Sequence, residues 1–348
     1  MKQLRRLGVR LPNWVGDICF AQPALAELRR ALPDTELIGA APEPLRELLE
    51  CFSELDDACT LAPGTLAPGL RRGAAALRAS RLDGIVLLPN SFASALEAAC
   101  AGIGRRIGFA GDGRALLLTD RPRRPRDAAG RRRHQVEEYA ALVRGWLGIE
   151  STVAAPDPCL RAPAHQIESA KRLLAECGCS PNATLIIVCP GAAFGAAKKW
   201  PAQRFAEAAD RLARRRGRTQ IVIAGGPADR PSCAAVAAGL EGRALDLCGR
   251  TSLGTLAGLL AGADLVLAND SGALHLALAL GTRAVGIYGP TDPSLSGPRG
   301  WNGAAMHTSL PCMPCLLRVC PLPRHLCMEQ VEVERVVRAA QQLFEGHV

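Results

Sequence analysis

The chain has 348 residues, more than one ordinary hydrophobic core organises, so we expect two domains. Hydrophobic residues make up 48% of the chain and charged residues 22%, a globular composition that excludes a largely disordered protein. The formal net charge of +9 calls for an anionic partner. Aromatic residues, at 4%, are too scarce for a nucleic-acid binder that works by base stacking.

Targeting signals and cysteine usage favour a cytoplasmic protein. The first residues, Met1 to Leu11, are basic but lack the apolar core of a secretory signal. The longest apolar stretch, Leu274 to Tyr288, is interrupted by polar residues and by Gly281, so it predicts a buried helix and a strand instead of a membrane span. Most of the fourteen cysteines lie singly in apolar segments, where a thiol behaves as a small core residue. We therefore expect a reducing compartment.

In chain order, β-branched or leucine-rich runs alternate with helical runs, the pattern of βαβ units around parallel sheets. The first half predicts strands at 7–11, 37–41, 84–89 and 105–109, and helices at 17–31, 91–101 and 134–147. A proline-containing linker at 154–164 and a helix at 165–177 follow. The second half predicts strands at 185–190, 220–225, 244–248, 264–269 and 284–288, and a final helix within 329–344.

One basic segment stands apart. Arg121 to His134 contains seven arginines, two prolines and no large apolar residue, so we expect an exposed loop. Two interpretations are open: a solvated basic loop, or an electrostatic platform for phosphorylated or carboxylated ligands at a membrane surface.

The first candidate site is the turn from Leu11 to Asp17 (LPNWVGD), which follows a predicted strand. Ligands of open α/β sheets bind beyond the carboxyl ends of the strands. Gly16 permits close approach of the backbone to a ligand. Asp17 has two interpretations, a helix N-cap that accepts backbone N–H groups or a general base facing a cleft between the domains.

The second candidate is a loop of small residues, Pro190 to Pro201 (PGAAFGAAKKWP), after a predicted strand of the second half. Lys198 and Lys199 place positive charge beside a helix start, where a pyrophosphate would be stabilised by the ammonium groups and the helix-end amides. The alternative is a pair of lysines on a solvated loop. The GxxxxGK[ST] phosphate-binding loop is absent.

The third candidate, Asn269 to Ala277 (NDSGALHLA), follows the predicted strand that contains Leu265 to Leu267. Asp270 and Ser271 are residue types that cap helices, and Gly272 lets a bound group approach the first N–H donors. A diphosphate can bind there. His275 falls one turn later, so it is either a ligand contact or a structural histidine.

The fourth candidate is a cysteine-rich segment near the C-terminus. Cys312, Cys315, Cys320 and Cys327, with a histidine nearby, have spacing related to that of zinc ligands. The second pair, Cys320 and Cys327, is spaced too widely to form a second compact zinc-binding turn, so we favour structural thiols over zinc.

Taken together, these segments resemble the ADP-heptose:lipopolysaccharide heptosyltransferases, glycosyltransferase family 9, and within it the heptosyltransferase II branch. The matching segments span nearly the whole chain in the family's order. They are PNWVGD at 12–17, PGAAFGAAKKWP at 190–201, NDSGALHLALALG at 269–281, YGPTDP at 288–293 and the PCMPC…CP…H…CM arrangement at 311–328.

The resemblance implies an α/β protein with the GT-B fold, two Rossmann-like domains facing each other across a cleft. It implies an acceptor-binding N-terminal domain (1–160) and a nucleotide-sugar-binding C-terminal domain (161–328). It also implies that a C-terminal helix (329–348) packs back on the N-terminal domain.

The resemblance carries over to single residues. Asp17 matches the family's catalytic carboxylate, Lys198 the lysine that contacts the donor phosphates, and Asp270 the acid that contacts the heptose. Asp229, in GGPAD, loosely matches a position near the ribose or adenine. The expected donor-binding residues are Gly16, Lys198, Asp229, Asp270, Ser271, Gly272 and His275.

The implied function is inverting transfer of heptose from ADP-L-glycero-β-D-manno-heptose to heptosyl-Kdo2-lipid A, in lipopolysaccharide inner-core synthesis. Asp17 would take the acceptor proton, while Lys198 and amides near Ser271 would neutralise the departing diphosphate. We therefore expect no metal or other cofactor. Two alternatives stay open: another GT-B sugar-nucleotide enzyme, such as a different heptosyltransferase or an epimerase, or a non-catalytic lipopolysaccharide-binding homologue.

The expected partners follow from this function. They are the ADP-heptose donor, the lipid A–Kdo–heptose acceptor and, transiently, the anionic cytoplasmic face of the inner membrane. No nucleic acid is expected.

Overall fold

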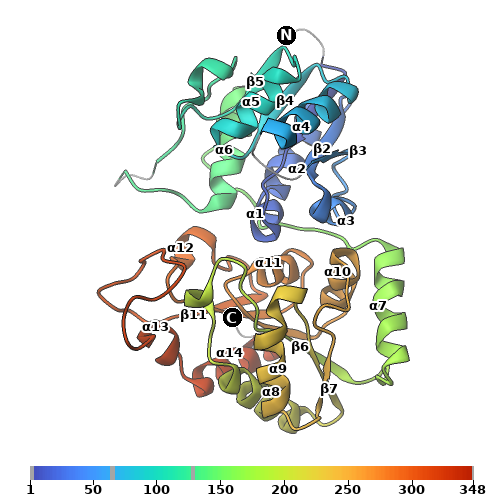
Figure 1. Ribbon diagram of the computed structural model, residues 1–348, viewed down its shortest axis with the longest axis vertical. Coiled ribbons are helices and arrows are strands. Elements are labelled where there is room, and N and C mark those ends of the chain that lie inside the picture. The colour runs from blue at the N-terminus through green and yellow to red at the C-terminus, as the bar shows by residue number, and fades with distance from the viewer. Residues whose placement is uncertain (1–3, 63–66, 127–129, 347–348) are drawn as a thin grey trace. The chain divides into compact units, whose positions relative to one another are not determined.

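The computed structural model of the chain describes residues 4–62, 67–126 and 130–346. The chain divides into two compact units, Met1–Leu160 and Arg161–Val348. Each unit contains one parallel sheet with helices packed against it (Figure 1).

The first unit is built on a five-stranded sheet with the strand order β3-β2-β1-β4-β5. β1 is central, and its Val9 pairs with Gly39 of β2 on one side and with Val86 of β4 on the other. All of β4 is buried, as expected of a parallel strand covered on both faces. The strands are β1 (Arg6–Arg10), β2 (Glu36–Pro42), β3 (Asp57–Leu61), β4 (Gly84–Leu87) and β5 (Arg105–Ile107).

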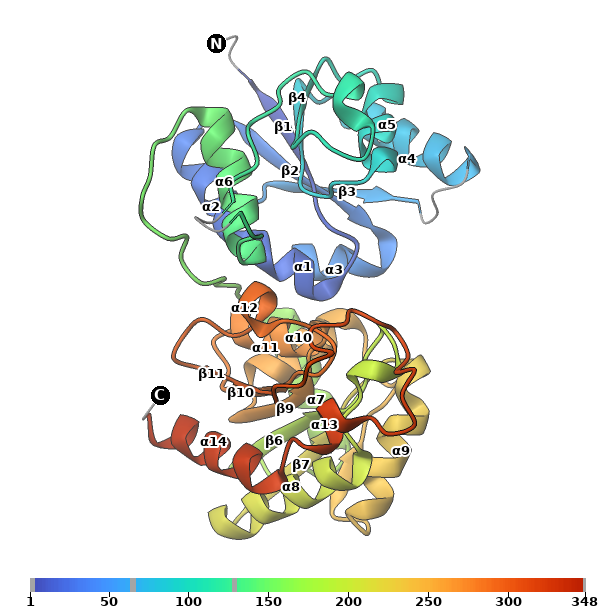
Figure 2. The same cartoon turned by 90° about the vertical axis from the view of Figure 1, so that its left-hand side faces the viewer.

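Helices cover both faces of this sheet (Figure 2). α4 and α5 pack on one face through residues such as Leu77 and Ala95, and α2 and α6 contact each other on the opposite face. The helices are α1 (Val15–Phe20), α2 (Gln22–Ala31), α3 (Arg46–Leu49), α4 (Ala67–Ala79), α5 (Phe92–Cys100) and α6 (Gln135–Leu147), with 3₁₀ turns η1 (Glu43–Leu45) and η2 (Arg114–Leu117). The single helix predicted over 17–31 is two helices, because Pro23 has no N–H to bond the preceding turn.

The second unit is built on a six-stranded sheet with the strand order β11-β10-β9-β6-β7-β8. Its two central strands are β9 and β6, and Val188 of β6 pairs with Ile223 of β7 and with Leu267 of β9. The strands are β6 (Thr184–Cys189), β7 (Thr219–Ile223), β8 (Ala244–Asp246), β9 (Leu265–Asn269), β10 (Ala284–Ile287) and β11 (Gly303–Met306).

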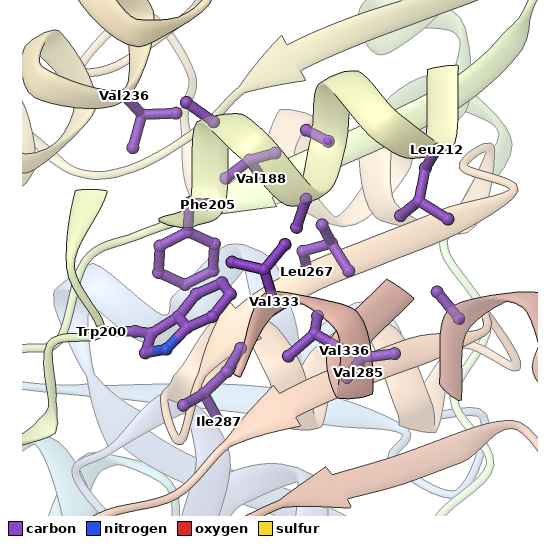
Figure 3. Close-up of a cluster of buried hydrophobic side chains, with 14 of the residues drawn as sticks. Val188, Trp200, Phe205, Leu212, Val236, Leu267, Val285, Ile287, Val333 and Val336 are labelled. Carbon is purple, nitrogen blue, oxygen red and sulfur yellow. The ribbon is translucent and has the colours of Figure 1, made fainter. Parts of the chain in front are cut away.

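The core of the second unit lies between this sheet and helices α8, α9 and α14 (Figure 3). Trp200 and Phe205 pack edge to face with 4.9 Å between ring centroids, beside Ile287 and Val336. The helices are α7 (Ala164–Glu176), α8 (Ala202–Arg216), α9 (Arg230–Gly239), α10 (Leu253–Ala261), α11 (Gly272–Ala279), α12 (Pro293–Ser296), α13 (Leu326–Glu329) and α14 (Val333–Glu345), with 3₁₀ turns η3 (Ala196–Lys198) and η4 (Pro227–Asp229).

The C-terminal helix α14 buries its apolar stripe in the second unit. Val333, Val336 and Leu343 belong to the same core as Trp200, and α14 contacts α8, β10 and β11. The family resemblance led us to expect the segment 329–348 on the N-terminal domain. An amphipathic helix has one apolar face, and here the sheet of the second unit occupies it.

Among the elements that were not predicted are β3, α4 and β11. The segment before α4 is rich in Pro and Gly, and β11 (GAAM) has no β-branched residue. The sequence pattern therefore predicted neither α4 nor β11. Part of the predicted basic loop, 127–129, lies outside the described residues.

In both sheets the strand order reverses, between β1 and β4 in the first unit and between β6 and β9 in the second. Ligands of open α/β sheets bind at the carboxyl ends of the strands beside such a reversal. The turn after β1 leads to Asp17, and the loops after β6 and β9 lead to Lys198 and Asp270. The topology therefore places a candidate site residue at this edge in each unit.

No helix in the part of the chain that the structure describes is both long and apolar enough to cross a membrane.

Candidate functional site

Asp270, directly after β9, is the centre of a cluster of polar side chains. Its side chain is 3% exposed. Lys198 Nζ donates a hydrogen bond to Oδ2 of Asp270 over 2.5 Å, and the Thr291 hydroxyl donates to the same oxygen over 2.6 Å. Nε2 of His275 lies 3.1 Å from Oδ1. Side chains from the loop after β6, the turn after β10 and helix α11 thus converge on one buried carboxylate.

The electrostatics of this cluster keep Asp270 ionised. Burial by itself would raise the pKa of the carboxyl group. The hydrogen bond and electrostatic attraction of His275, together with the positive charge of Lys198, outweigh burial and hold the pKa of Asp270 well below its ordinary value.

The loop that carries Lys198 is fixed to β9 by Asn269, which is fully buried. Its Oδ1 accepts a hydrogen bond from the Trp200 amide over 2.9 Å, and its Nδ2 donates to the carbonyl of Pro190 over 2.8 Å. Trp200 Nε1 in turn donates to the carbonyl of Val331 over 3.0 Å. Both ends of the loop are therefore attached to the core.

The middle of the same loop is covered by the segment that follows β11. The Ala197 amide donates to the carbonyl of Arg318 over 3.0 Å. Gly195 has φ of +156°, and a side chain there would lie 2.3 Å from that carbonyl oxygen. The ring of Phe194 lies 4.9 Å from Lys198 Nζ and 5.5 Å from the Arg318 guanidinium, within the range of cation–π attraction.

A cavity of about 150 Å³ lies beside this cluster. The described part of the chain leaves Ser271 Oγ buried and without a hydrogen-bond partner, and Ser271 occupies the N-cap position of α11 without capping it. The cavity can therefore offer a hydroxyl group and the first amides of α11 to a ligand. Its lining residues are Cys189, Gly191, Ala192, Ala193, Ala224, Gly225, Gly226, Asp229, Leu256, Ser271, Gly272 and Ala273.

Asp229 forms the opposite wall of the cavity. Its carboxylate accepts a hydrogen bond from the Gly226 amide over 3.0 Å. A side chain on Gly191 would lie 2.2 Å from the carboxyl carbon of Asp229, so it would displace the Asp229 carboxylate from this position.

The structure thus sorts the predicted donor residues of the second unit into two adjoining groups. Lys198, Asp270 and His275 are in direct contact, whereas Asp229, Ser271 and Gly272 line the cavity. The two groups meet where Asp270 precedes Ser271 in the chain.

Two residues of this site were not predicted individually, Asn269 and Thr291. Both lie inside motifs quoted from the sequence, NDSG and YGPTDP. Their position directly after β9 and β10 was the available signal, because neighbouring parallel strands end at one edge.

In the first unit, Asp17 is the third residue of α1 and is half-buried. The N-cap position belongs to Trp14, so the interpretation of Asp17 as an N-cap is wrong. Burial raises the pKa of Tyr139, on α6, well above its ordinary value, and the negative charge of Asp17 adds to this rise. Gly16 is buried beside Asp17 in the same helix.

A buried arginine that the sequence analysis missed fixes the turn before α1. Arg10 donates to the carbonyl of Leu11 and, over 2.9 Å, to Oδ1 of Asn13. Its Nε lies 3.4 Å from Oε2 of Glu97. Burial lowers the pKa of Arg10, and the attraction of Glu97 opposes that shift.

The four C-terminal cysteines are thiols, as are the other ten. Burial raises the pKa of Cys327 to about 11, and Cys320, Cys315 and Cys312 contribute to the rise. Across residues 4–62, 67–126 and 130–346, no group of three or more His, Cys, Asp or Glu side chains is arranged to hold a metal ion.

The described part of the basic loop is tied to helix α6. Arg124 and Arg132 form ion pairs with Glu138, with N···O distances of 2.7 and 3.3 Å. Two of the seven arginines therefore share one carboxylate, which neutralises one of their two charges within the protein.

Comparison with known proteins gives consistent matches. The sequence profile of glycosyltransferase family 9 (heptosyltransferase) matches residues 70–325. Lipopolysaccharide heptosyltransferase 2 of Salmonella typhimurium is 33% identical over 295 residues, which cover 82% of this chain and 83% of that protein.

Solved structures agree with the sequence matches. E. coli ADP-heptose LPS heptosyltransferase II superposes with a TM-score of 0.80 at 26% identity and covers 98% of both chains. A family 9 glycosyl transferase from Veillonella parvula superposes with a TM-score of 0.84 at 22% identity, covering 98% of this chain and 97% of that one. The predicted GT-B fold class, with two Rossmann-like α/β domains, is confirmed.

Replacing Asp270 with Asn should reduce the free energy of unfolding in a pH-dependent way. The pKa of the native carboxyl lies below its unfolded value of about 3.9, so its stabilising contribution is fully present above that pH and is lost as the pH falls through the native pKa. In urea denaturation, the difference between wild type and Asp270→Asn should therefore stay constant from about pH 7 to about pH 5 and shrink as the pH falls below about 4. Glu241→Gln, at a side chain 82% exposed, is the control. A difference that stays constant with pH would contradict the assigned ionisation.

Proposed function

Because the chain belongs to glycosyltransferase family 9, the heptosyltransferases, we propose that it transfers heptose from ADP-L-glycero-β-D-manno-heptose to heptosyl-Kdo2-lipid A in the lipopolysaccharide inner core. The chain is a glycosyltransferase. The observation that carries the specific proposal is the cluster of Lys198 and His275 on Asp270, next to the start of α11. The names of the relatives in Salmonella typhimurium and E. coli support the choice of sugar and acceptor.

The donor diphosphate binds between Lys198 and the start of α11 in this proposal. The helix end presents amide donors and a partial positive charge, and Ser271 Oγ is buried there with no partner among the described residues. Lys198 has three N–H donors and uses one on Asp270. It can therefore bind a phosphate oxygen while it keeps that ion pair.

The nucleoside occupies the cavity beside α11. Leu256 and Ala192 supply apolar walls, and Asp229 has carboxylate lone pairs left after accepting the Gly226 amide. These can accept hydrogen bonds from ribose hydroxyl groups. Asp270, with His275, contacts the heptose next to the diphosphate.

Asp17 is the general base. It removes the proton of the acceptor hydroxyl as that oxygen forms a bond to the anomeric carbon of the donor. The bond from that carbon to the phosphate oxygen breaks, its electron pair leaves with ADP, and the configuration inverts. Gly16 remains a proposed donor contact, because a residue without a side chain leaves space beside Asp17.

The charge that develops on ADP is neutralised by Lys198 and by amides at Ser271 and Gly272, groups that are already oriented in the fold. These groups support transfer without a metal ion. We place the enzyme at the cytoplasmic face of the inner membrane, where the arginines of 121–133 are attracted to anionic lipids.

The direct test is ADP release from ADP-heptose in the presence of heptosyl-Kdo2-lipid A, with the product identified by a mass increase of one heptose. Release of UDP from UDP-sugars or of GDP from GDP-sugars, in place of ADP release, would assign another sugar-nucleotide reaction. Acceptor binding without turnover would assign a non-catalytic role.

Replacing Asp17 with Asn should lower kcat by about 10²- to 10⁴-fold, because a general base contributes that much. ADP affinity, measured by calorimetry, should stay close to that of wild type, since Asp17 does not belong to the Lys198 cluster. Asp34→Asn, at an exposed turn residue of the same unit, is the matched control. Near-normal turnover by Asp17→Asn would remove Asp17 from this role.

Replacing Lys198 with Ala should weaken binding of ADP and raise the KM for the donor by about tenfold or more, since a charge-assisted hydrogen bond is worth about 1.5–3 kcal/mol. Lys199→Ala is a close control, because Lys199 Nζ donates to Ser232 Oγ over 3.0 Å instead of to Asp270. Equal effects of the two substitutions on donor affinity would show that charge near the loop, and not the Lys198 position, binds the phosphates.

A further inference from the structure

The segment 316–322, which we call the aliphatic loop, exposes four large aliphatic side chains. Leu316, Leu317, Val319 and Leu322 are between 44% and 69% exposed. Single exposed aliphatic residues are normal on protein surfaces, whereas so dense a group marks a surface that binds something.

Backbone hydrogen bonds fix the aliphatic loop to the rest of the second unit. Its side chains are therefore exposed on a segment that is packed against the fold. The Leu316 amide donates to the carbonyl of Pro290 over 2.9 Å, and the carbonyl of Arg318 accepts from the Ala197 amide over 3.0 Å. Leu316 has φ of +55°, a conformation that is unfavourable for a leucine. The fold therefore holds strained backbone at a residue whose side chain points into solvent.

The charge around the loop is mainly positive. Between Asp292 and Glu329 the sequence contains three arginines, Arg299, Arg318 and Arg324, and no carboxylate; Arg324 forms an ion pair with Glu329 itself over 2.8 Å. Arginine beside exposed leucine and valine is the composition of a surface that binds anionic lipid. Protein interfaces are enriched in Tyr, Trp, Phe, Met and Arg, and of these residue types the aliphatic loop contains Arg318 alone.

The loop lies against both segments that build the donor cluster. The carbonyl of Pro290 accepts a hydrogen bond from the Leu316 amide. Pro290 directly precedes Thr291, whose hydroxyl donates to the Asp270 carboxylate. Ala197, which donates to Arg318, directly precedes Lys198. The aliphatic loop therefore belongs to the donor-site edge of its sheet.

We propose that the aliphatic loop is a docking surface for the anionic lipid bilayer that holds the acceptor. This inference rests on the proposed function: in heptosyl-Kdo2-lipid A only a few sugar units separate the reacting hydroxyl from the acyl chains, so the donor-site edge works close to the bilayer. Leu316, Leu317, Val319 and Leu322 enter the headgroup region, and Arg318 lies among the lipid phosphates.

The test compares wild type with a variant that combines Leu316→Ser, Leu317→Ser, Val319→Ser and Leu322→Ser. A matched control carries Ile149→Ser and Val153→Ser, two exposed aliphatic residues of the first unit. Circular dichroism checks that each protein is folded. Co-sedimentation with vesicles of phosphatidylethanolamine and phosphatidylglycerol measures docking, and ADP release is followed with the acceptor in vesicles and with a deacylated, soluble acceptor.

We expect the fourfold variant to bind vesicles at least about tenfold more weakly, because four aliphatic side chains no longer bury apolar surface in the bilayer. Its rate on the vesicle-bound acceptor should fall, while kcat/KM on the soluble acceptor stays unchanged. The control variant should behave as wild type. Unchanged vesicle binding of the fourfold variant overturns the proposal.

Two other results would also overturn it. An equal loss of activity on the soluble acceptor would assign the aliphatic loop to sugar binding. A wild-type oligomer that the fourfold variant converts to a monomer in sedimentation velocity would assign the surface to a second copy of the chain. If wild type shows no ADP release with the soluble acceptor, the proposed function itself fails, and the vesicle measurement still reports separately on docking.

Discussion

The buried carboxylate of Asp270 is the constraint on which the second unit depends. A charge at a side chain 3% exposed is costly to desolvate, and it is tolerated only when it is well paired. Here the partners come from three separate segments, through Lys198, His275 and Thr291. Moving any one of these segments would leave a buried charge poorly compensated, so the cluster requires all of them to be placed together.

The rest of the unit supplies that placement. Asn269, beside Asp270, bonds both ends of the Lys198 loop. Trp200 then connects the loop to the C-terminal segment through the carbonyl of Val331, which also accepts from Arg204 over 2.7 Å. Helix α14 begins two residues after Val331 and packs in the same core as Trp200. The C-terminal segment therefore helps to hold the Lys198 loop in place. This explains why α14 lies in the second unit, although the family resemblance had led us to expect it elsewhere.

The sequence was informative where hydrophobic period and turn chemistry agree. Most strands, the two-unit α/β class and the motifs around Lys198 and Asp270 could be read from it, because buried parallel strands are apolar runs followed by polar turns. β11 was missed because GAAM forms a strand only through its pairing with β10, a tertiary effect that outweighs propensity. Arg10 was missed for a related reason: a charged residue inside an apolar strand gives no hint of Glu97, far along the chain, until the fold brings them together.

The Asp270 cluster also explains how one site can bind a dianionic diphosphate without rearranging. In the described structure Lys198 is already oriented by Asp270 and by the face of Phe194, and the Asp270 carboxylate also has Thr291 and His275 as partners. When Lys198 shares its ammonium group with a phosphate, Asp270 keeps those two partners and remains satisfied. The orientation of the lysine is thus set during folding, before any ligand binds. Dipoles and charges fixed in this way stabilise developing charge more effectively than groups that must first reorganise, which is the physical reason for placing a buried carboxylate next to a site for an anion.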